Sequence, residues 1–393
     1  MKISIIHHFG GLGGGLISCL DVAKMLVDLG NDVEVYISNP DQQVRTLFAD
    51  NGIKLKDNVP EIIELTYHNA SSNALIAILK SLKSYKNCKL WMRFFEELDT
   101  DLIIFNSLVQ SPMIPLAKKA KKKCILFIRE TIRGSSNTML NKLLKSFLNH
   151  VDAVVYLTEY DKESWGLSDS IKQFIVPDIV NSDYFESNLE QHERKESKTT
   201  FIYLGGFSRI KGALDVLLAF EKFIKKGNSG QLYMLGGTYE YLLNASGIRK
   251  IFHKNEINYM KECFETVNRI NSKEKKVHVI GLTTSTEKWY LLSDVIVFPV
   301  NKVHQARPVY EAGYFGKTVI LPEYDNFAEA VVDKYNGLYY KKNSIEDLCD
   351  KMEQISSDTK LCELMSQRNK ELYEKNHSYI VGMKALEKVV SEI

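Results

Sequence analysis

Short apolar runs alternate with amphipathic stretches along most of the chain. Ile3–His7 has the pattern of a buried strand, a glycine-rich turn follows at Gly10–Gly15, and Leu16–Leu29 has apolar residues at helical spacing up to Gly30. This order of strand, turn and helix predicts a parallel sheet covered by helices on both faces. The further strands predicted for this first sheet are Asp32–Ile37, Leu102–Asn106, Cys124–Ile128 and Ala153–Leu157.

A second series of the same kind begins after a polar stretch, residues 178–200, which we interpret as a linker. At 393 residues the chain is long enough for two cores. We therefore expect two α/β domains, residues 1–180 and 200–377, and a C-terminal helix, residues 378–393, that packs back on the first domain. The tail from Ser344 is expected to be helical. The strands predicted for the second sheet are Phe201–Gly205, Gln231–Gly236, Val277–Ile280, Val295–Pro299 and Thr318–Leu321.

The composition indicates which class of protein the chain belongs to. Hydrophobic residues make up 45% and charged residues 25%, as in ordinary globular proteins. No apolar run approaches the roughly 18–20 residues that cross a bilayer, and the N-terminus lacks the long apolar core of a signal peptide. The six cysteines form no C-x-x-C pair, which argues against a disulfide framework or a zinc site. We therefore predict a cytoplasmic protein.

The segment FIYLGGFSRIKGALDVLLAF, residues 201–220, joins a predicted strand to a predicted helix. Lys211 and Gly212 stand where the helix begins. Free amides at a helix N-terminus and an adjacent cation form a ready site for a diphosphate. The alternative is a surface turn with solvated basic side chains.

The segment ARPVYEAGYFGKTVILPEYDNFAEAVVDKYNGLYY, residues 306–340, contains a second candidate site. Glu311 lies on a predicted helix that ends near Gly316, and a carboxylate there can accept hydrogen bonds from both hydroxyls of a ribose. The loop Glu323–Phe327 is expected to open a further helix whose N-terminal amides face phosphate. A solvent-facing glutamate in an ordinary α/β repeat is the alternative.

Together these two segments resemble the donor domain of family 4 glycosyltransferases of the GT-B fold. The order of the intervening segments LYMLGG, VHVIGLTT and WYLLSDVIVFPV matches as well, and the first half fits through its glycine-rich turn, VDAVVYLTEYDKE and IVPDIVNSDYF. The resemblance covers nearly the whole chain. It implies an α/β GT-B fold in which two Rossmann-like domains face each other across a central cleft, with a helical C-terminal tail.

The resemblance also implies roles for individual residues. Lys211, with Arg209 nearby, would stabilise the departing diphosphate, and Glu311 would hold the ribose hydroxyls. The base would contact the turn at Leu282 and Thr283. Amides near the phosphates or the sugar would come from Asp325, Asn326 and Phe327, and close approach of the first domain to the donor would be permitted by Gly13, Gly14 and Gly15.

Three positions depart from the family pattern. Val303 stands where a second glutamate is usual, Gly206 where an arginine is usual, and Arg129-Glu130 where a histidine is frequent. Arg209, His304 and Arg307 are close enough in sequence to substitute. We place Gly206 and Arg307 among the donor-contacting residues and Arg129 among the catalytic ones.

The function implied is transfer of a sugar from a nucleotide diphosphate sugar, UDP-linked, to a carbohydrate or lipid-linked glycan in bacterial surface-polysaccharide synthesis. Retention of anomeric configuration is what the resemblance implies. Two alternatives stay open: an inactive donor-binding partner subunit, suggested by Val303 and Gly206, and a GT-B sugar-nucleotide epimerase. A dinucleotide oxidoreductase is disfavoured, because Gly13-x-Gly15-x-x-Ser18 lacks the third glycine and the second strand ends without an acid.

No cofactor and no metal are predicted. Asp99-Thr100-Asp101 has the D-x-D form that binds metal in another glycosyltransferase class, but it directly precedes a strand, where an aspartate often caps the turn. Lysine, arginine and helix N-termini can neutralise a leaving diphosphate without a metal.

Charge is unevenly distributed along the chain. Residues 75–150 carry 14 Lys and Arg against 5 Asp and Glu. Within them, residues 74–95 set lysines at helical spacing beside Trp91, Phe94 and Phe95, and residues 118–123 are lysine-rich. Such a pattern is typical of a helix at an anionic membrane, here the inner face of the cell membrane, or of a solvated helix face. A nucleic-acid partner is not predicted.

Overall fold

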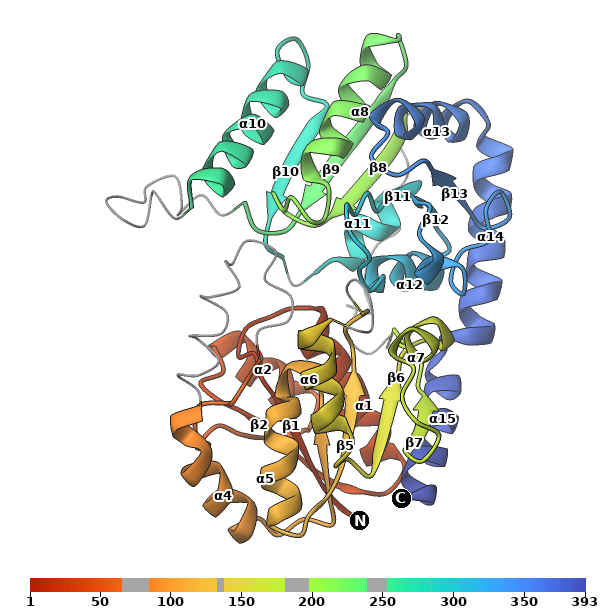
Figure 1. Ribbon diagram of the computed structural model, residues 1–393. Coiled ribbons are helices and arrows are strands. Elements are labelled where there is room, and N and C mark those ends of the chain that lie inside the picture. The colour runs from red at the N-terminus through yellow and green to blue at the C-terminus, as the bar shows by residue number, and fades with distance from the viewer. Residues whose placement is uncertain (66–84, 133–137, 181–197, 239–252, 284) are drawn as a thin grey trace. The chain divides into compact units, whose positions relative to one another are not determined.

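The computed structural model describes residues 1–65, 85–132, 138–180, 198–238, 253–283 and 285–393 (Figure 1). The chain divides into two compact units, Met1–Asn181 with His377–Ile393, and Ser182–Asn376. Most of the predicted linker and residues 74–84 of the predicted membrane segment lie outside the described residues.

The first unit is built on a parallel sheet in the order β3-β2-β1-β4-β5-β6-β7. The order reverses between β1 and β4, so the carboxyl ends of these two strands form a topological switch point, where open α/β sheets bind ligands. The strands are β1 (Lys2–His7), β2 (Asp32–Ile37), β3 (Lys54–Lys56), β4 (Leu102–Phe105), β5 (Lys123–Ile128), β6 (Ala153–Tyr156) and β7 (Lys172–Ile175).

Helices cover both faces of this first sheet (Figure 1). The C-terminal helix α15 (Tyr379–Glu392) packs against α1 (Gly14–Asp28), and a Cβ at Gly382 would lie 2.6 Å from Ile179 Cγ2. A glycine is therefore needed where α15 packs against the rest of the first unit. The other helices are α2 (Gln42–Asp50), α4 (Cys88–Glu97), α5 (Ile114–Lys119), α6 (Met139–Leu148), α7 (Glu159–Trp165) and the 3₁₀ turns η1 (Tyr85–Asn87) and η2 (Leu108–Met113).

The second unit repeats this plan with the strand order β10-β9-β8-β11-β12-β13 and a switch point between β8 and β11. Its strands are β8 (Thr199–Leu204), β9 (Gly230–Leu235), β10 (Val277–Gly281), β11 (Val295–Val297), β12 (Thr318–Pro322) and β13 (Gly337–Tyr340). Its helices are α8 (Ala213–Lys225), α10 (Lys254–Ile270), α11 (Glu287–Leu292), α12 (Arg307–Tyr314), α13 (Ile345–Ser357) and α14 (Thr359–Asn376), with the 3₁₀ turn η5 (Asp325–Phe327).

Apolar residues on both faces of the sheet form the cores of the second unit. On β8, Phe201 and Tyr203 join the cluster under α8, α10 and α13, whereas Ile202 joins the cluster on the opposite face with Tyr290 and Phe298. Figure 1 shows α8 and α10 on the first of these faces. A strand buried on both faces reads as a continuous apolar run, which is why FIYL predicted β8 from the sequence.

The aromatic residues of the basic segment have a structural role. Trp91 and Phe95 on α4 are fully buried in the core of the first unit, where the Trp91 indole N–H donates to the Glu61 carbonyl (2.9 Å). The expectation that Trp91 and Phe95 mark a headgroup boundary is therefore wrong. They point inward because the apolar side of an amphipathic helix packs on the sheet.

The D-x-D sequence lies at the amino edge of the first sheet. The Asp101 carboxylate accepts from the Lys2 amide (2.8 Å), and Asp99 pairs with the Lys2 ammonium. Both carboxylates are therefore used to hold the start of β1, at the edge opposite the switch point. Among the helices of the described residues, none is both long and apolar enough to span a membrane.

Candidate functional site

The loops after β8 and β9 meet at the carboxyl edge of the second sheet. The amides of Gly205 and Gly206 donate to the Leu235 carbonyl (3.0 and 2.8 Å), and a Cβ at Gly206 would lie 2.2 Å from the Gly237 oxygen. Gly206 also has φ +58°. The position where the family pattern expects an arginine is thus closed against the neighbouring loop, so only glycine fits.

The loop after β8 is also fixed to β11. Gly212 has φ +75°, and a Cβ there would lie 1.8 Å from the Pro299 oxygen. The Asn301 amide donates to the Ile210 carbonyl (2.8 Å) and its side chain to the Arg209 carbonyl (3.1 Å). Lys211, between these contacts, therefore has its backbone held from both sides at the switch point.

Lys211 is half-buried, and its ammonium makes no hydrogen bond or ion pair within the described residues. Burial lowers the pKa of Lys211, and the negative charge of Glu311 acts in the opposite direction. Burying an ammonium without a hydrogen-bonded partner is costly, so such groups are uncommon outside functional sites. The arrangement is suited to receiving an anion from outside the protein.

Glu311 on α12 is the negative counterpart of Lys211 at the same edge. Its carboxylate accepts from the Arg307 Nε (2.9 Å) and from the Tyr290 hydroxyl (2.6 Å), and its side chain remains 16% exposed. Burial, and then Glu311, raises the pKa of Tyr290 well above its usual value, so Tyr290 stays a neutral donor. Two partners fix the carboxylate and leave further lone pairs for a ligand.

Tyr290 was missed by the sequence analysis. It lies on α11 in WYLLSD, a segment that resembles an ordinary amphipathic helix, and its partner is 21 positions away. Arg307, expected among the donor-contacting residues, is the ion-pair partner of Glu311, with a side chain 12% exposed.

Arg209 points toward α10. Its guanidinium lies 4.6 Å from the centroid of the Tyr259 ring, and Nη2 donates to the Asn255 carbonyl (3.4 Å). Arg209 is exposed, whereas Lys211 is half-buried and the negative charge of Glu311 raises its pKa against the effect of burial. The structure thus separates the two cations that the sequence placed together.

The segment after β12 differs from the expectation. Residues 325–327 form one 3₁₀ turn and no α-helix follows, because Val331 is a core residue and the Val332 amide donates to the Asn336 side chain (2.7 Å). Phe327 is fully buried, and its amide donates to the Tyr324 carbonyl (3.1 Å). The predicted further helix is therefore wrong.

Asn326 has a more specific placement. Its side-chain amide donates to the His304 carbonyl (3.0 Å), and its buried Oδ1 has no hydrogen-bond partner in the described part of the chain. Asp325 beside it is exposed. An orphaned carbonyl oxygen is a candidate acceptor for a ligand hydroxyl.

The turn after β10 supplies the remaining residues of this edge. Gly281 has φ +81°, Leu282 is 85% exposed, and the Thr283 hydroxyl accepts from the Ser285 amide (3.2 Å). The Gly281 carbonyl accepts from the Gly236 amide (2.8 Å), so this turn joins the loop after β9. Backbone and an exposed apolar side chain are thus available here to a planar ring.

In the first unit, the glycine-rich turn lies at the carboxyl end of β1. Gly13 precedes α1, and Gly14 and Gly15 are in its first turn; a Cβ at Gly13 would meet open space. Packing within the unit therefore does not require a glycine at Gly13. The glycine that packing does require is Gly10, where a Cβ would lie 2.6 Å from the Asn39 oxygen.

Arg129 is held by partners of the first unit. Its guanidinium donates to the Asn106 side chain (2.9 Å) and the Ser18 carbonyl (3.3 Å) and pairs with Asp178 (3.3 Å). The Asn106 side chain in turn donates to the Gly15 carbonyl (3.3 Å). Arg129 is thus placed to position the glycine-rich turn.

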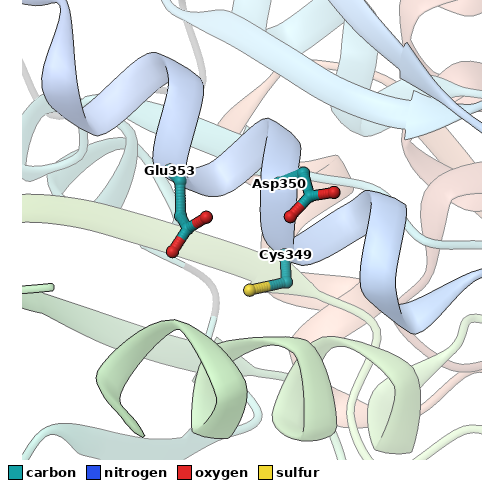
Figure 2. Close-up of side chains that lie close together, drawn as sticks. All are labelled: Cys349, Asp350 and Glu353. Carbon is teal, nitrogen blue, oxygen red and sulfur yellow. The ribbon is translucent and has the colours of Figure 1, made fainter. Parts of the chain in front are cut away.

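One group of possible metal ligands occurs in the described residues, on α13 (Figure 2). The Lys226 ammonium already bridges the carboxylates of Asp350 (2.9 Å) and Glu353 (3.0 Å), and Cys349 is fully buried in the core. The Lys226 ammonium occupies the place that a metal ion would take between the two carboxylates. We therefore interpret this group as an ion-pair network that joins the end of α8 to α13.

One family model matches the second unit. Residues 185–372 match the family model described as glycosyl transferases group 1. No curated protein matches the sequence. The match covers nearly all of the unit that carries Lys211 and Glu311.

Solved structures resemble the whole chain. HepE from Anabaena, in complex with UDP-glucose, is 13% identical with a TM-score of 0.78, and all of both chains is covered. A glycosyltransferase from Rickettsia africae is 17% identical with a TM-score of 0.72, covering 100% of this chain and 98% of that one. TarM from S. aureus, in complex with fondaparinux, alpha-GlcNAc-glycerol and UDP, is 12% identical with a TM-score of 0.71 and covers 99% of each. The two parallel-sheet units and these likenesses confirm the α/β GT-B fold.

Proposed function

We propose that the protein is a glycosyltransferase that uses a nucleotide diphosphate sugar, UDP-linked, bound at the carboxyl edge of the second sheet. The observation that carries this proposal is Lys211, a half-buried ammonium that has no hydrogen-bonded partner in the described residues and that is influenced by the negative charge of Glu311. A diphosphate would supply the missing anion, and Glu311 would accept the ribose hydroxyls. UDP or UDP-glucose in the HepE structures, and UDP in that of TarM, support this donor class.

The proposed chemistry depends on position and charge. Transfer breaks the bond between the anomeric carbon and the diphosphate oxygen and forms one between the anomeric carbon and an acceptor hydroxyl oxygen, which gives up its proton. Negative charge therefore develops on the leaving diphosphate. Lys211 would stabilise that charge, and its fixed backbone means that little reorganisation is needed during the reaction. Arg209 would contribute only after leaving Tyr259, which gives Lys211 the larger role. Arg129 would act by positioning the glycine-rich turn.

We propose that further residues near Lys211 and Glu311 also contact the donor. The turn at Leu282 and Thr283 would contact the base, and Asn326, with the amide of Asp325, would contact the sugar or phosphates. Phe327 would support this turn from the core. Gly13, Gly14 and Gly15 would give the first unit room beside the donor, as the open space at Gly13 allows.

The acceptor is proposed to be a carbohydrate or lipid-linked glycan used in surface-polysaccharide synthesis, and the site of action the cytoplasmic face of the cell membrane. The TarM structure holds the glycoside alpha-GlcNAc-glycerol together with UDP, which supports a glycan ligand beside the donor. We also propose that the reaction retains anomeric configuration, which the linkage of the product, read by NMR, would test.

Turnover separates this proposal from its alternatives. The full-length protein is incubated with UDP-sugars, with and without glycan acceptors, and both UDP and sugar products are measured. Acceptor-dependent release of UDP supports a transferase. An altered nucleotide sugar formed without acceptor supports an epimerase, and binding without turnover on any acceptor supports an inactive partner subunit; either result would displace the proposal.

Glu311→Gln is expected to weaken UDP binding by roughly ten- to a hundredfold, because a hydrogen bond to a charged group is worth about 1.5–3 kcal/mol. Calorimetry with UDP is the measurement. Tyr290→Phe is the matched control, since it removes one partner of the carboxylate and keeps its charge, and a smaller loss is expected. Equal affinity of Glu311→Gln and the unaltered protein would remove Glu311 from the site.

Chelation is expected to leave activity unchanged, because Lys211 can take the role of a cation at the diphosphate. Transfer rates are compared before and after dialysis against EDTA. Loss of turnover that magnesium or manganese restores would contradict metal independence.

A further inference from the structure

Helix α6 begins at the carboxyl edge of the first sheet, on the chain that leaves β5. Thr138 caps it, its hydroxyl accepting from the Asn141 amide (3.2 Å). Asn141, Leu144 and Leu148 are buried against the unit. This spacing fixes which side of α6 faces the core, and so which side faces outward.

The outward side of α6 is apolar at its start. Met139 is 90% exposed, Leu140 38% and Leu143 45%. Fourteen large apolar side chains are exposed in the described residues. Three of them lie within residues 139–143, whereas most of the others are scattered along the chain. We call these three residues the α6 patch. Grouped apolar exposure of this kind marks an interaction surface.

Charge around the α6 patch indicates its partner. Lys142 is exposed and Lys145 half-exposed, and α6 has no acidic residue. Helix α5 packs against both α6 and α4 (Figure 1). On α4, Lys89 and Arg93 are exposed, and the Arg93 guanidinium pairs with Glu97 (2.7 Å). Apolar side chains flanked by cations match a surface that is apolar below and anionic above, which is the leaflet of an anionic membrane.

We propose that the α6 patch inserts into the headgroup boundary of an anionic lipid leaflet, with Lys142 and Lys145 on the lipid phosphates. The proposal rests on the proposed function in one respect: α6 starts at the same sheet edge as the glycine-rich turn, so docking there would bring this edge to a lipid-linked acceptor. In this proposal the α6 patch, and not the buried Trp91 and Phe95, is the apolar part of the membrane contact.

Flotation of the full chain with vesicles tests this proposal. Vesicles of pure phosphatidylcholine are compared with vesicles containing one third phosphatidylglycerol, from low to high salt. Binding to the anionic vesicles alone, released as salt rises, is expected. Equal binding to both kinds of vesicle, or to neither, would overturn the proposal.

Two variants separate the apolar and the charged contributions. Met139→Gln with Leu143→Gln is expected to reduce partitioning at least tenfold, because buried apolar area is lost. Lys142→Gln with Lys145→Gln is expected to reduce it roughly fivefold for each lysine. The control, Leu364→Gln with Ile380→Gln, changes two exposed apolar residues on α14 and α15 and should leave binding unchanged. An equal loss in the control would overturn the assignment to α6.

The outcome is independent of the donor site. Thermal stabilisation by UDP should be the same in all three variants and the unaltered protein, so a failure of nucleotide binding in every sample would contradict the proposed function and leave the α6 proposal standing. Sedimentation of the protein without vesicles tests whether a second copy of the chain, and not lipid, occupies the α6 patch. A dimer that Met139→Gln with Leu143→Gln dissociates, with no vesicle binding, would assign the α6 patch to a second copy of the chain and overturn the lipid proposal.

Discussion

Replacing Lys211 with methionine is expected to weaken UDP binding by roughly ten- to a hundredfold while raising the melting temperature of the ligand-free protein. The affinity falls because a charge-assisted contact with the diphosphate, about 1.5–3 kcal/mol, is lost. The stability rises because a half-buried ammonium with no hydrogen-bonded partner in the described residues is replaced by an apolar chain of similar length. Calorimetry and thermal unfolding measure the two effects.

The opposite signs of these two effects distinguish a ligand-binding lysine from a structural one. A lysine that stabilised the fold would lower the melting temperature when removed. Lys360→Met, on the exposed side of α14, is the matched control and should change neither quantity. Loss of stability in Lys211→Met together with unchanged UDP affinity would contradict the assignment.

The pH dependence follows from the same group. Burial lowers the pKa of Lys211 in the free protein, so its ammonium deprotonates at a lower pH than an exposed lysine. A bound diphosphate favours the charged form, and UDP affinity is therefore expected to fall as pH rises through the lowered pKa. Lys211→Arg should keep its affinity to higher pH, because guanidinium stays protonated, and Lys211→Met should lack this dependence.

Gly212→Ala is expected to cost the second unit about 3 kcal/mol, or roughly 6–12 °C in melting temperature for a unit of this size. Two effects add: a Cβ would lie 1.8 Å from the Pro299 oxygen, and φ +75° is unfavourable for alanine. UDP binding should weaken too, because Lys211 is the preceding residue.

Gly227→Ala is the control for Gly212→Ala. It has φ +93°, and a Cβ there would meet nothing within 4 Å. Only backbone strain remains, so about 1 kcal/mol, or roughly 2–4 °C, is expected. Similar melting temperatures for the two variants would mean that the loop after β8 is not closed against β11.

The fold could be predicted where the sequence pattern is local. Continuous apolar runs such as FIYL and LIIF identify strands buried on both faces, and Gly30 marks a helix end, where it has φ +82°. The short strand β3, KLK, was missed because it contains two lysines. The helix predicted after Phe327 was wrong because the Val332 amide donates to the Asn336 side chain four residues further on, and this local side chain–backbone hydrogen bond competes with helix formation.

The site could be predicted in part for the same reason. Lys211 and Gly212 occupy a recognisable place between a strand and a helix. The hydrogen bond from Tyr290 to Glu311 and the close approach of Gly206 to Gly237 join segments that are far apart in the sequence. No local spacing of residues predicts these contacts. Arg209 and Lys211 are two positions apart, yet the ring of Tyr259 holds the first away from the second.

A crystal structure of the full chain grown with UDP tests the central claim most directly. The account predicts the diphosphate within hydrogen-bonding distance of the Lys211 ammonium, the ribose hydroxyls on the Glu311 carboxylate, and the base beside Leu282. Density for UDP at any other place on the second unit, with Lys211 still unpartnered, would contradict it.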